Sequence, residues 1–137
     1  MITSDTLKRY WAKLAVLLIA DGEKKAQWLK KHRIFHHIGE NCSFKTNILP
    51  AEPFLVCLHD NVRLAAGCRL ITHSMTCSVF NRATGSNRFY CQYGKIEIHS
   101  NVFVGGGSTI MYGVTIGENS IVAAGSVVTK DAPAGSV

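Results

Sequence analysis

The sequence predicts a mainly β protein: a parallel β-helix of about four coils, with an N-terminal α-helical segment and one long protruding loop. Three observations lead to this prediction. A six-residue repeat runs from Ile98 to near the end of the chain, and its phase can be followed back to about Ile38. Spacing typical of α-helices is confined to the beginning. We therefore divide the 137 residues into a helical segment, 1–35, and a β-helix domain, 36–137.

The helical segment has the pattern of two short helices. Apolar residues first recur at helical spacing: Leu7, Trp11, Leu14, Leu17 and Leu18. The dipeptide Asp21-Gly22 ends this helix, and a second is expected over about 23–32, with Ala26 and Leu29 facing inward and the lysines outward. Two short helices bury little surface alone, so they should pack against the β-helix domain.

Positive charge is concentrated in the same segment. Of the net charge of +6, residues 1–35 supply +5, from eight Lys or Arg against Asp5, Asp21 and Glu23. No nucleic-acid motif accompanies these charges, so a solvated helix face is the favoured interpretation and no nucleic-acid partner is predicted. The strongly apolar run from Leu14 to Ala20 is too short for a membrane span, and a cytoplasmic protein is expected.

From Ile98 the chain divides into units of six. The first place of each unit is Ile or Val: Ile98, Val104, Ile110, Ile116, Val122 and Val128. The fifth place is small or β-branched: Val102, Ser108, Val114, Ser120, Ser126 and Ala132. Each unit then supplies one strand and one corner, and three units close a triangular coil. The branched residue points into a narrow interior, and Gly or Asn at the corners adopts the left-handed backbone conformation.

The same phase extends towards the N-terminus. First places fall on Ile38, Phe44, Leu58, Leu64 and Leu70, and fifth places on Cys42, Ile48, Val62 and Cys68. Prolines at 50 and 53 disturb the count. The expected coils are roughly 38–57, 58–97, 98–115 and 116–133. The second is far too long for a coil, so a loop, 74–95, must leave the solenoid there.

Two segments carry a family resemblance: HDNVRLAAGCRLITH (59–73) and KIEIHSNVFVGGGSTIMYGVTIGENSIVAAGSVVTKDAPAGSV (95–137). They resemble the hexapeptide-repeat acyltransferase superfamily, in particular its maltose, galactoside and xenobiotic O-acetyltransferase branch. The resemblance implies a left-handed β-helix that assembles as a homotrimer. It also implies transfer of an acetyl or other acyl group from acyl-CoA, such as acetyl-CoA, to a hydroxyl or amine of a small, saccharide-like acceptor.

In that family a histidine at the end of a coil, just before the loop, is the general base, and His73 matches it. Histidine suits the role because it is neutral near pH 7 and can then protonate a leaving thiolate. Many relatives have Asp directly after this histidine, whereas this chain has Ser74. Asp60 and Glu97 are possible replacements. Asn47 is a candidate donor to the oxyanion.

Further site residues are implied by the same resemblance. Five positions match residues near the acyl-CoA: Phe103, Gly106, Ala124, Thr129 and Lys130. The loop supplies four candidates for binding an acceptor by stacking or charge: Arg82, Arg88, Tyr90 and Tyr93. Loop aromatics that anchor on a neighbouring subunit are an equally good interpretation.

Two alternatives to an acyltransferase stay open. His59 and His99 occupy second places, where they should stack on adjacent coils. A metal-dependent hydratase of the carbonic anhydrase kind would use such histidines, but no third ligand is found at a corresponding position, and no metal is expected. A non-catalytic solenoid that binds or scaffolds partners is the other alternative. The five cysteines show no CxxC spacing and are expected to be reduced.

Overall fold

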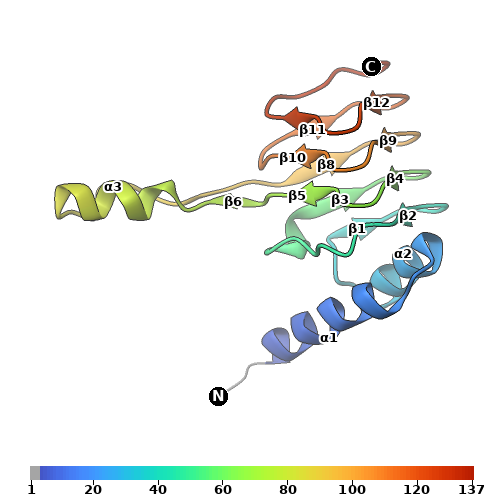
Figure 1. Ribbon diagram of the computed structural model, residues 1–137, viewed down its shortest axis with the longest axis horizontal. Coiled ribbons are helices and arrows are strands. Elements are labelled where there is room, and N and C mark those ends of the chain that lie inside the picture. Colours follow the sequence, from blue (N-terminus) through green and yellow to red (C-terminus); the bar gives the residue numbers. More distant parts are fainter. Residues whose placement is uncertain (1–3) are drawn as a thin grey trace.

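The computed structural model describes residues 4–137, which form a parallel β-helix of four coils with three sheets (Figure 1). The first sheet contains β1 (His37–Ile38), β3 (Val56–Leu58), β8 (Ile96–Ile98) and β11 (Thr115–Ile116). The second sheet contains β2 (Ser43–Phe44), β4 (Arg63–Leu64), β9 (Phe103–Val104) and β12 (Ile121–Val122). The third sheet contains β5 (Arg69–Leu70), β10 (Thr109–Ile110) and β13 (Val127–Val128).

The strand register confirms the phase of the repeat. In the first sheet Ile38 pairs with Leu58, Leu58 with Ile98, and Ile98 with Ile116, and all four side chains are buried. The other two sheets stack their first-place residues in the same way. The core is therefore a column of branched side chains, one layer for each coil, and the four predicted coils are present.

Asparagines form one corner of the prism. Asn61, Asn101 and Asn119 have φ angles of 55°, 60° and 56°, in the left-handed region. Their side chains also form a ladder, because the amide of Asn61 donates to Asn101 and that of Asn101 to Asn119, each over 3.0 Å. Asn is well suited to this corner because it tolerates the left-handed conformation and bonds to the next copy of itself.

The first coil departs from the predicted phase. A short 3-10 turn, η1 (Pro53–Leu55), is found where the other coils have a third strand. Ile48, which we expected to point inward, is 40% exposed, and Thr46 is buried instead. Thr46 takes the inner place because its hydroxyl donates to the carbonyl of Cys68 and accepts from the amide of Ile48. The six-residue phase is therefore lost at Thr46 and Ile48, before the prolines at 50 and 53.

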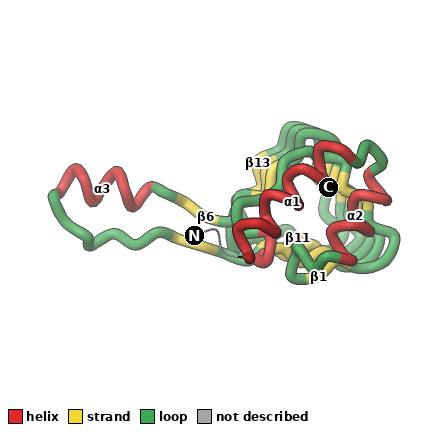
Figure 2. Tube along the Cα trace, turned by 90° about the horizontal axis from the view of Figure 1, so that it is seen from below, coloured by secondary structure: helices red, strands yellow, loops and turns green. Residues whose placement is uncertain are grey.

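Two helices lie across the N-terminal end of the solenoid: α1 (Ser4–Leu18) and α2 (Gly22–Lys31) (Figure 2). The Asp21 side chain caps α2 by accepting from the amide of Lys24 over 2.8 Å. Ala26 and Leu29 are buried as expected, but Lys25 is also buried, at 1% exposure, against the prediction of outward lysines. In α1 the side chains of Ala12 and Val16 are buried, whereas the larger apolar residues remain exposed.

An arm leaves the second coil where the long loop was expected (Figure 1). Strands β6 (His73–Ser74) and β7 (Gln92–Tyr93) pair in antiparallel fashion at its base, and helix α3 (Thr76–Thr84) forms its outer part. The predicted loop therefore has secondary structure of its own. None of the helices within residues 4–137 combines the length and the hydropathy that a bilayer crossing requires.

A disulfide corrects the prediction of five reduced cysteines. Cys77 in α3 is bonded to Cys91, just before β7. The two half-cystines are fourteen positions apart and join both sides of the arm, so sequence spacing alone did not single them out. The other three thiols are free and buried in the solenoid.

Candidate active site at the base of the arm

His73 stands where the second coil ends and the arm begins. It follows β5 by three positions and pairs with Tyr93 across the base of the arm. Its side chain is 26% exposed, and its ring centroid lies 5.4 Å from that of Tyr93. The imidazole is thus held by the solenoid on one side and by β7 on the other, while part of it still faces solvent.

A carboxylate holds one nitrogen of this imidazole. Glu52 Oε2 lies 2.8 Å from His73 Nδ1, and the Thr72 hydroxyl donates to the same carboxylate oxygen. The amide of Glu52 in turn donates to the Thr72 hydroxyl over 3.2 Å. Thr72 is 1% exposed, so this network rests on a buried anchor.

The electrostatics of Glu52 suit this contact. Partial burial on its own raises the pKa of Glu52, but the hydrogen bonds with Thr72 and His73 outweigh it and lower the pKa below the ordinary value. Glu52 is therefore an anion at neutral pH and accepts a hydrogen bond from Nδ1–H of His73. This tautomer leaves the lone pair on Nε2, for which no hydrogen-bond partner is found in residues 4–137.

Neither replacement suggested for the missing aspartate reaches His73. Glu97 pairs with His59, and Asp60 accepts from the amide of Glu40. Ser74 turns away, towards Thr76. The residue that contacts the imidazole, Glu52, was missed because it lies in the first coil, beyond Ile48, where the six-residue phase that aligns one coil with the next is already lost.

Asn47 lies near the N-terminal end of the solenoid and contacts α2. Its Oδ1 accepts from the Lys25 ammonium over 2.7 Å, and the same ammonium donates to the carbonyl of Thr46 over 3.1 Å. The Asn47 side chain therefore accepts from a buried lysine, and its predicted role at an oxyanion stays a prediction.

Thr129 and Lys130, two of the residues expected near acyl-CoA, lie at the same edge of the third sheet as His73. Val128 is in register with Ile110, and Ile110 with Leu70. Thr129 and Lys130, which come after Val128, therefore lie at the edge where the second coil continues into His73. Along the axis of the solenoid, Thr129 and His73 are two coils apart, which is about 10 Å at the spacing of parallel strands.

The other three residues of this group lie around the next corner. Phe103 is 46% exposed on the second sheet and lines a shallow groove of about 340 Å³ with Arg63 and Ile121. Gly106 and Ala124 stand at the corner between the second and third sheets, on adjacent coils. Within one chain, Phe103 and His73 thus belong to different sides of the prism.

The acceptor candidates are divided along the arm. Tyr93 is at its base against His73. Arg82 belongs to α3, Arg88 lies over the ring of Phe89 at 6.0 Å, and Tyr90 is 86% exposed. Only Tyr93 among the four is brought into contact with the imidazole in the part of the chain that the structure describes.

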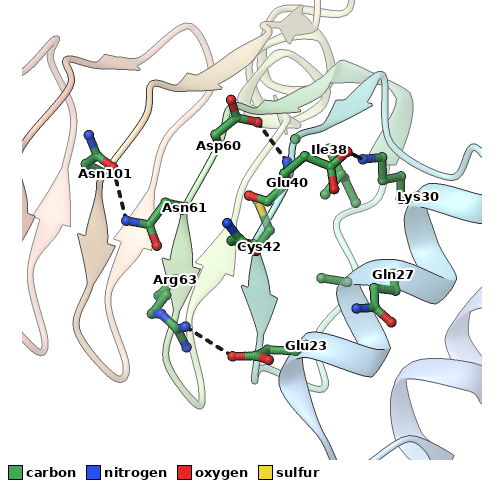
Figure 3. Close-up of a pocket in the computed structure, with 13 residues that line it drawn as sticks. Glu23, Gln27, Lys30, Ile38, Glu40, Cys42, Asp60, Asn61, Arg63 and Asn101 are labelled. Carbon is green, nitrogen blue, oxygen red and sulfur yellow. Dashed lines mark hydrogen bonds and ion pairs between the residues drawn. The ribbon is translucent and has the colours of Figure 1, made fainter.

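A second cleft, of about 580 Å³, lies between α2 and the asparagine corner (Figure 3). Its walls are closed by ion pairs, Lys30 with Glu40 and Arg63 with Glu23. Asp60 is among its lining residues, but neither His73 nor Asn47 is. The base of the arm is therefore the better candidate for an active site.

Comparison with known proteins agrees with this architecture. The family described as bacterial transferase hexapeptide (six repeats) matches residues 95–130. The galactoside O-acetyltransferase of Escherichia coli K12 is 36% identical over 97 residues, which are 71% of this chain and 46% of that protein. Residues 95–130 thus carry the hexapeptide repeat of this family, and 71% of the chain is similar to part of an O-acetyltransferase. It spans about half the length of the relatives that it matches in sequence.

Solved structures of hexapeptide-repeat proteins share the fold. A hexapeptide-repeat acetyltransferase of Vibrio cholerae, complexed with acetyl coenzyme A, superposes with a TM-score of 0.68 at 22% identity, covering 96% of this chain and 82% of that one. A maltose O-acetyltransferase of Clostridium difficile 630 gives a TM-score of 0.67 at 24% identity, covering 93% and 76%. The solenoid is thus a left-handed parallel β-helix.

Proposed function

We propose that this chain is an acetyl-CoA-dependent O-acetyltransferase in which His73 is the general base. The observation that carries the proposal is the contact between Glu52 and His73 at the edge of the solenoid. A carboxylate on Nδ1 fixes the tautomer that leaves Nε2 able to accept a proton, which is what the attack of a hydroxyl requires. The sequence relatives, named as acetyltransferases, support the same reaction type.

The proposed reaction is a direct transfer. His73 Nε2 takes the proton of the acceptor hydroxyl while the hydroxyl oxygen forms a bond to the thioester carbonyl carbon. The tetrahedral species then collapses with cleavage of the carbon–sulfur bond, and the imidazolium returns the proton to the leaving thiolate. Glu52 holds the ring in place throughout and stabilises the transient positive charge on the imidazole. The products are the acetyl ester and CoA with a free thiol.

Exposed groups on the upper coils suit the donor. The ammonium of Lys130 can pair with phosphate as a point charge, and Thr129 offers a hydroxyl beside it. Phe103 presents an exposed ring to an apolar portion of the donor. For acceptors, the names of the relatives, galactoside and maltose O-acetyltransferase, favour a saccharide, and Tyr93 beside His73 offers a ring on which a sugar can stack.

The proposal includes a homotrimer in the cytoplasm. Phe103 and His73 belong to different sides of one prism, and two adjoining copies of the chain would bring these sides together around one donor molecule. The arm, which carries four exposed aromatic side chains, would then lie against a neighbour: Phe80, Phe89, Tyr90 and Tyr93. A cyclic arrangement of three copies brings every groove next to an arm. Sedimentation equilibrium of the purified chain tests this assembly.

Free-thiol release from acetyl-CoA, measured with a panel of saccharide acceptors, tests the activity. With an accepted sugar, His73→Ala should lower kcat by about 10²–10⁴-fold, as loss of a general base does. His36→Ala is the matched control, because His36 is an exposed histidine outside the candidate site. Equal thiol release by His73→Ala and by the unmodified chain would overturn the assignment of the base.

A further inference from the structure

A second cluster of chemically capable side chains lies on the outside of the first sheet. Cys57 and Glu97 are paired residues of β3 and β8, and His59 comes directly after β3. One donor atom from each residue, the thiol sulfur, an imidazole nitrogen and a carboxylate oxygen, lies within 4.8 Å of the other two. Val56 and Leu58 point into the core on either side of Cys57, so strand alternation directs the thiol outward.

Cys57 differs from the other two free cysteines. Cys42 and Cys68 occupy inward places, and their thiols donate to backbone carbonyls of the adjacent coil. No hydrogen bond of the Cys57 thiol is found among residues 4–137, although the residue is only 6% exposed. The Cys57 residue is therefore buried, but its thiol has no hydrogen bond to the backbone of the described residues.

The other members of the cluster are oriented by their neighbours. His59 Nε2 lies 2.9 Å from Glu97 Oε1, and Lys95 donates to the second oxygen, Oε2, over 2.9 Å. The ring of His99 stacks on that of His59 at 4.6 Å, as the repeat phase predicted.

We propose that Cys57, His59 and Glu97 form a binding site for a divalent transition-metal ion, with Zn²⁺ as the best fit. One thiolate, one imidazole and one carboxylate form the mixed set of sulfur, nitrogen and oxygen donors that zinc accepts. Tetrahedral zinc bonds place donor atoms about 3.5 Å apart, and the three donor atoms already lie within 4.8 Å of one another. The fourth position is left for water.

The surroundings of the cluster match what metal ligands require. Ligating carboxylates are held by a second layer of hydrogen bonds, and here Lys95 donates to Glu97, while the ring of His99 stacks on that of His59. The exposed fractions of 35% for His59 and 26% for Glu97 leave a path for the ion. This departs from the expectation drawn from the sequence, which found no third ligand because it looked only at positions equivalent to His59 and His99.

The ion would cross-link two coils whose paired strands are far apart in the sequence. Strands β3 and β8 are neighbours in the first sheet, but the whole arm lies between them in sequence. Zinc bound to Cys57 and His59 on one coil and to Glu97 on the next joins them directly. The bound ion raises the free energy of unfolding because the unfolded chain has no preformed site. The proposal concerns stability and is independent of the activity at His73.

Cobalt titration of the tag-free, reduced chain tests the site. Co²⁺ should bind in a one-to-one ratio with the visible bands of a tetrahedral ion and the near-ultraviolet band of a thiolate–cobalt bond, and Zn²⁺ should displace it. Cys57→Ser should remove the thiolate band. His59→Ala and Glu97→Gln should each weaken binding at least about tenfold, since even second-layer losses have that effect. His36→Ala is the control and should change neither.

A second measurement guards against misfolded variants. Zn²⁺ should raise the Tm of the unmodified chain and of His36→Ala, but not that of Glu97→Gln, a nearly isosteric change on a partly exposed residue. Far-ultraviolet circular dichroism confirms that each variant is folded. A cobalt spectrum without the thiolate band, or an equal Tm increase in Glu97→Gln, would overturn the proposal.

Discussion

Glu52 and His73 are 21 positions apart in the sequence, yet Oε2 of one lies 2.8 Å from Nδ1 of the other. Each ends one turn of the solenoid, and the turns are stacked, so that the two side chains meet at a common edge. The contact resembles the carboxylate–imidazole pairs of other enzymes, in which the acid orients the ring.

Glu52→Gln should lower kcat and leave KM for acetyl-CoA nearly unchanged. The amide keeps the shape of the side chain but loses the negative charge that selects the Nδ1–H tautomer. The decrease should be on the order of tenfold to a hundredfold, less than the loss of the base itself. Steady-state kinetics with an accepted sugar measures both constants. Glu118→Gln, at an exposed corner, is the control; equal effects of the two substitutions would deny Glu52 a positioning role.

The acid stability of the fold should depend on Glu52. Its pKa is lowered in the folded chain, so the anion stabilises the fold above the unfolded pKa of about 4.3, and this contribution is lost as the pH falls through the lower folded pKa. Urea unfolding between pH 6 and about pH 2 should therefore show a weaker pH dependence in Glu52→Gln. An unchanged slope below pH 4.3 would contradict the assigned direction of the shift.

Lys25→Ala should destabilise the fold by about 1–3 kcal/mol, because it leaves a buried carbonyl acceptor without its donor. The Lys25 ammonium is the donor to the Thr46 carbonyl and to Asn47. Burial lowers the pKa of Lys25, and the nearby Lys45 adds to this. Lys24→Ala, at the adjacent exposed position, should change stability by less than about 0.5 kcal/mol. Urea denaturation of both variants compares the two positions directly.

Reduction of the disulfide should loosen the arm and spare the solenoid. Cys77 and Cys91 join α3 to the strand that returns to the coil. After treatment with a thiol reductant, amide hydrogen exchange should become faster in residues 76–90 and stay the same in the three sheets. KM for the acceptor should rise if the arm binds it. Cys77→Ser should reproduce the effect without reductant. If exchange in the arm is as slow after reduction as before it, the disulfide does not stabilise the arm.

The solenoid was predictable because its determinant is local and repeated. Ile98, Ile110 and Ile116 mark the inward places by themselves, and any chain with this pattern must turn a corner every six residues. Even the stacking of His59 on His99 was predictable from counting. The prediction failed at Ile48, where Thr46 bonds to the next coil and changes which side chain points inward.

The repeat, the number of coils and the position of His73 at the junction with the arm all follow from the order of residues in the chain. Three contacts between distant residues became visible only in the folded chain: Glu52 with His73, Cys77 with Cys91, and Cys57 with His59 and Glu97. The repeat specifies which places point inward and which coils stack, but it cannot specify contacts made where a coil is irregular or a segment is inserted. These contacts depend on how an irregular first coil and an inserted arm are aligned with their neighbours, and that alignment exists only in the folded chain.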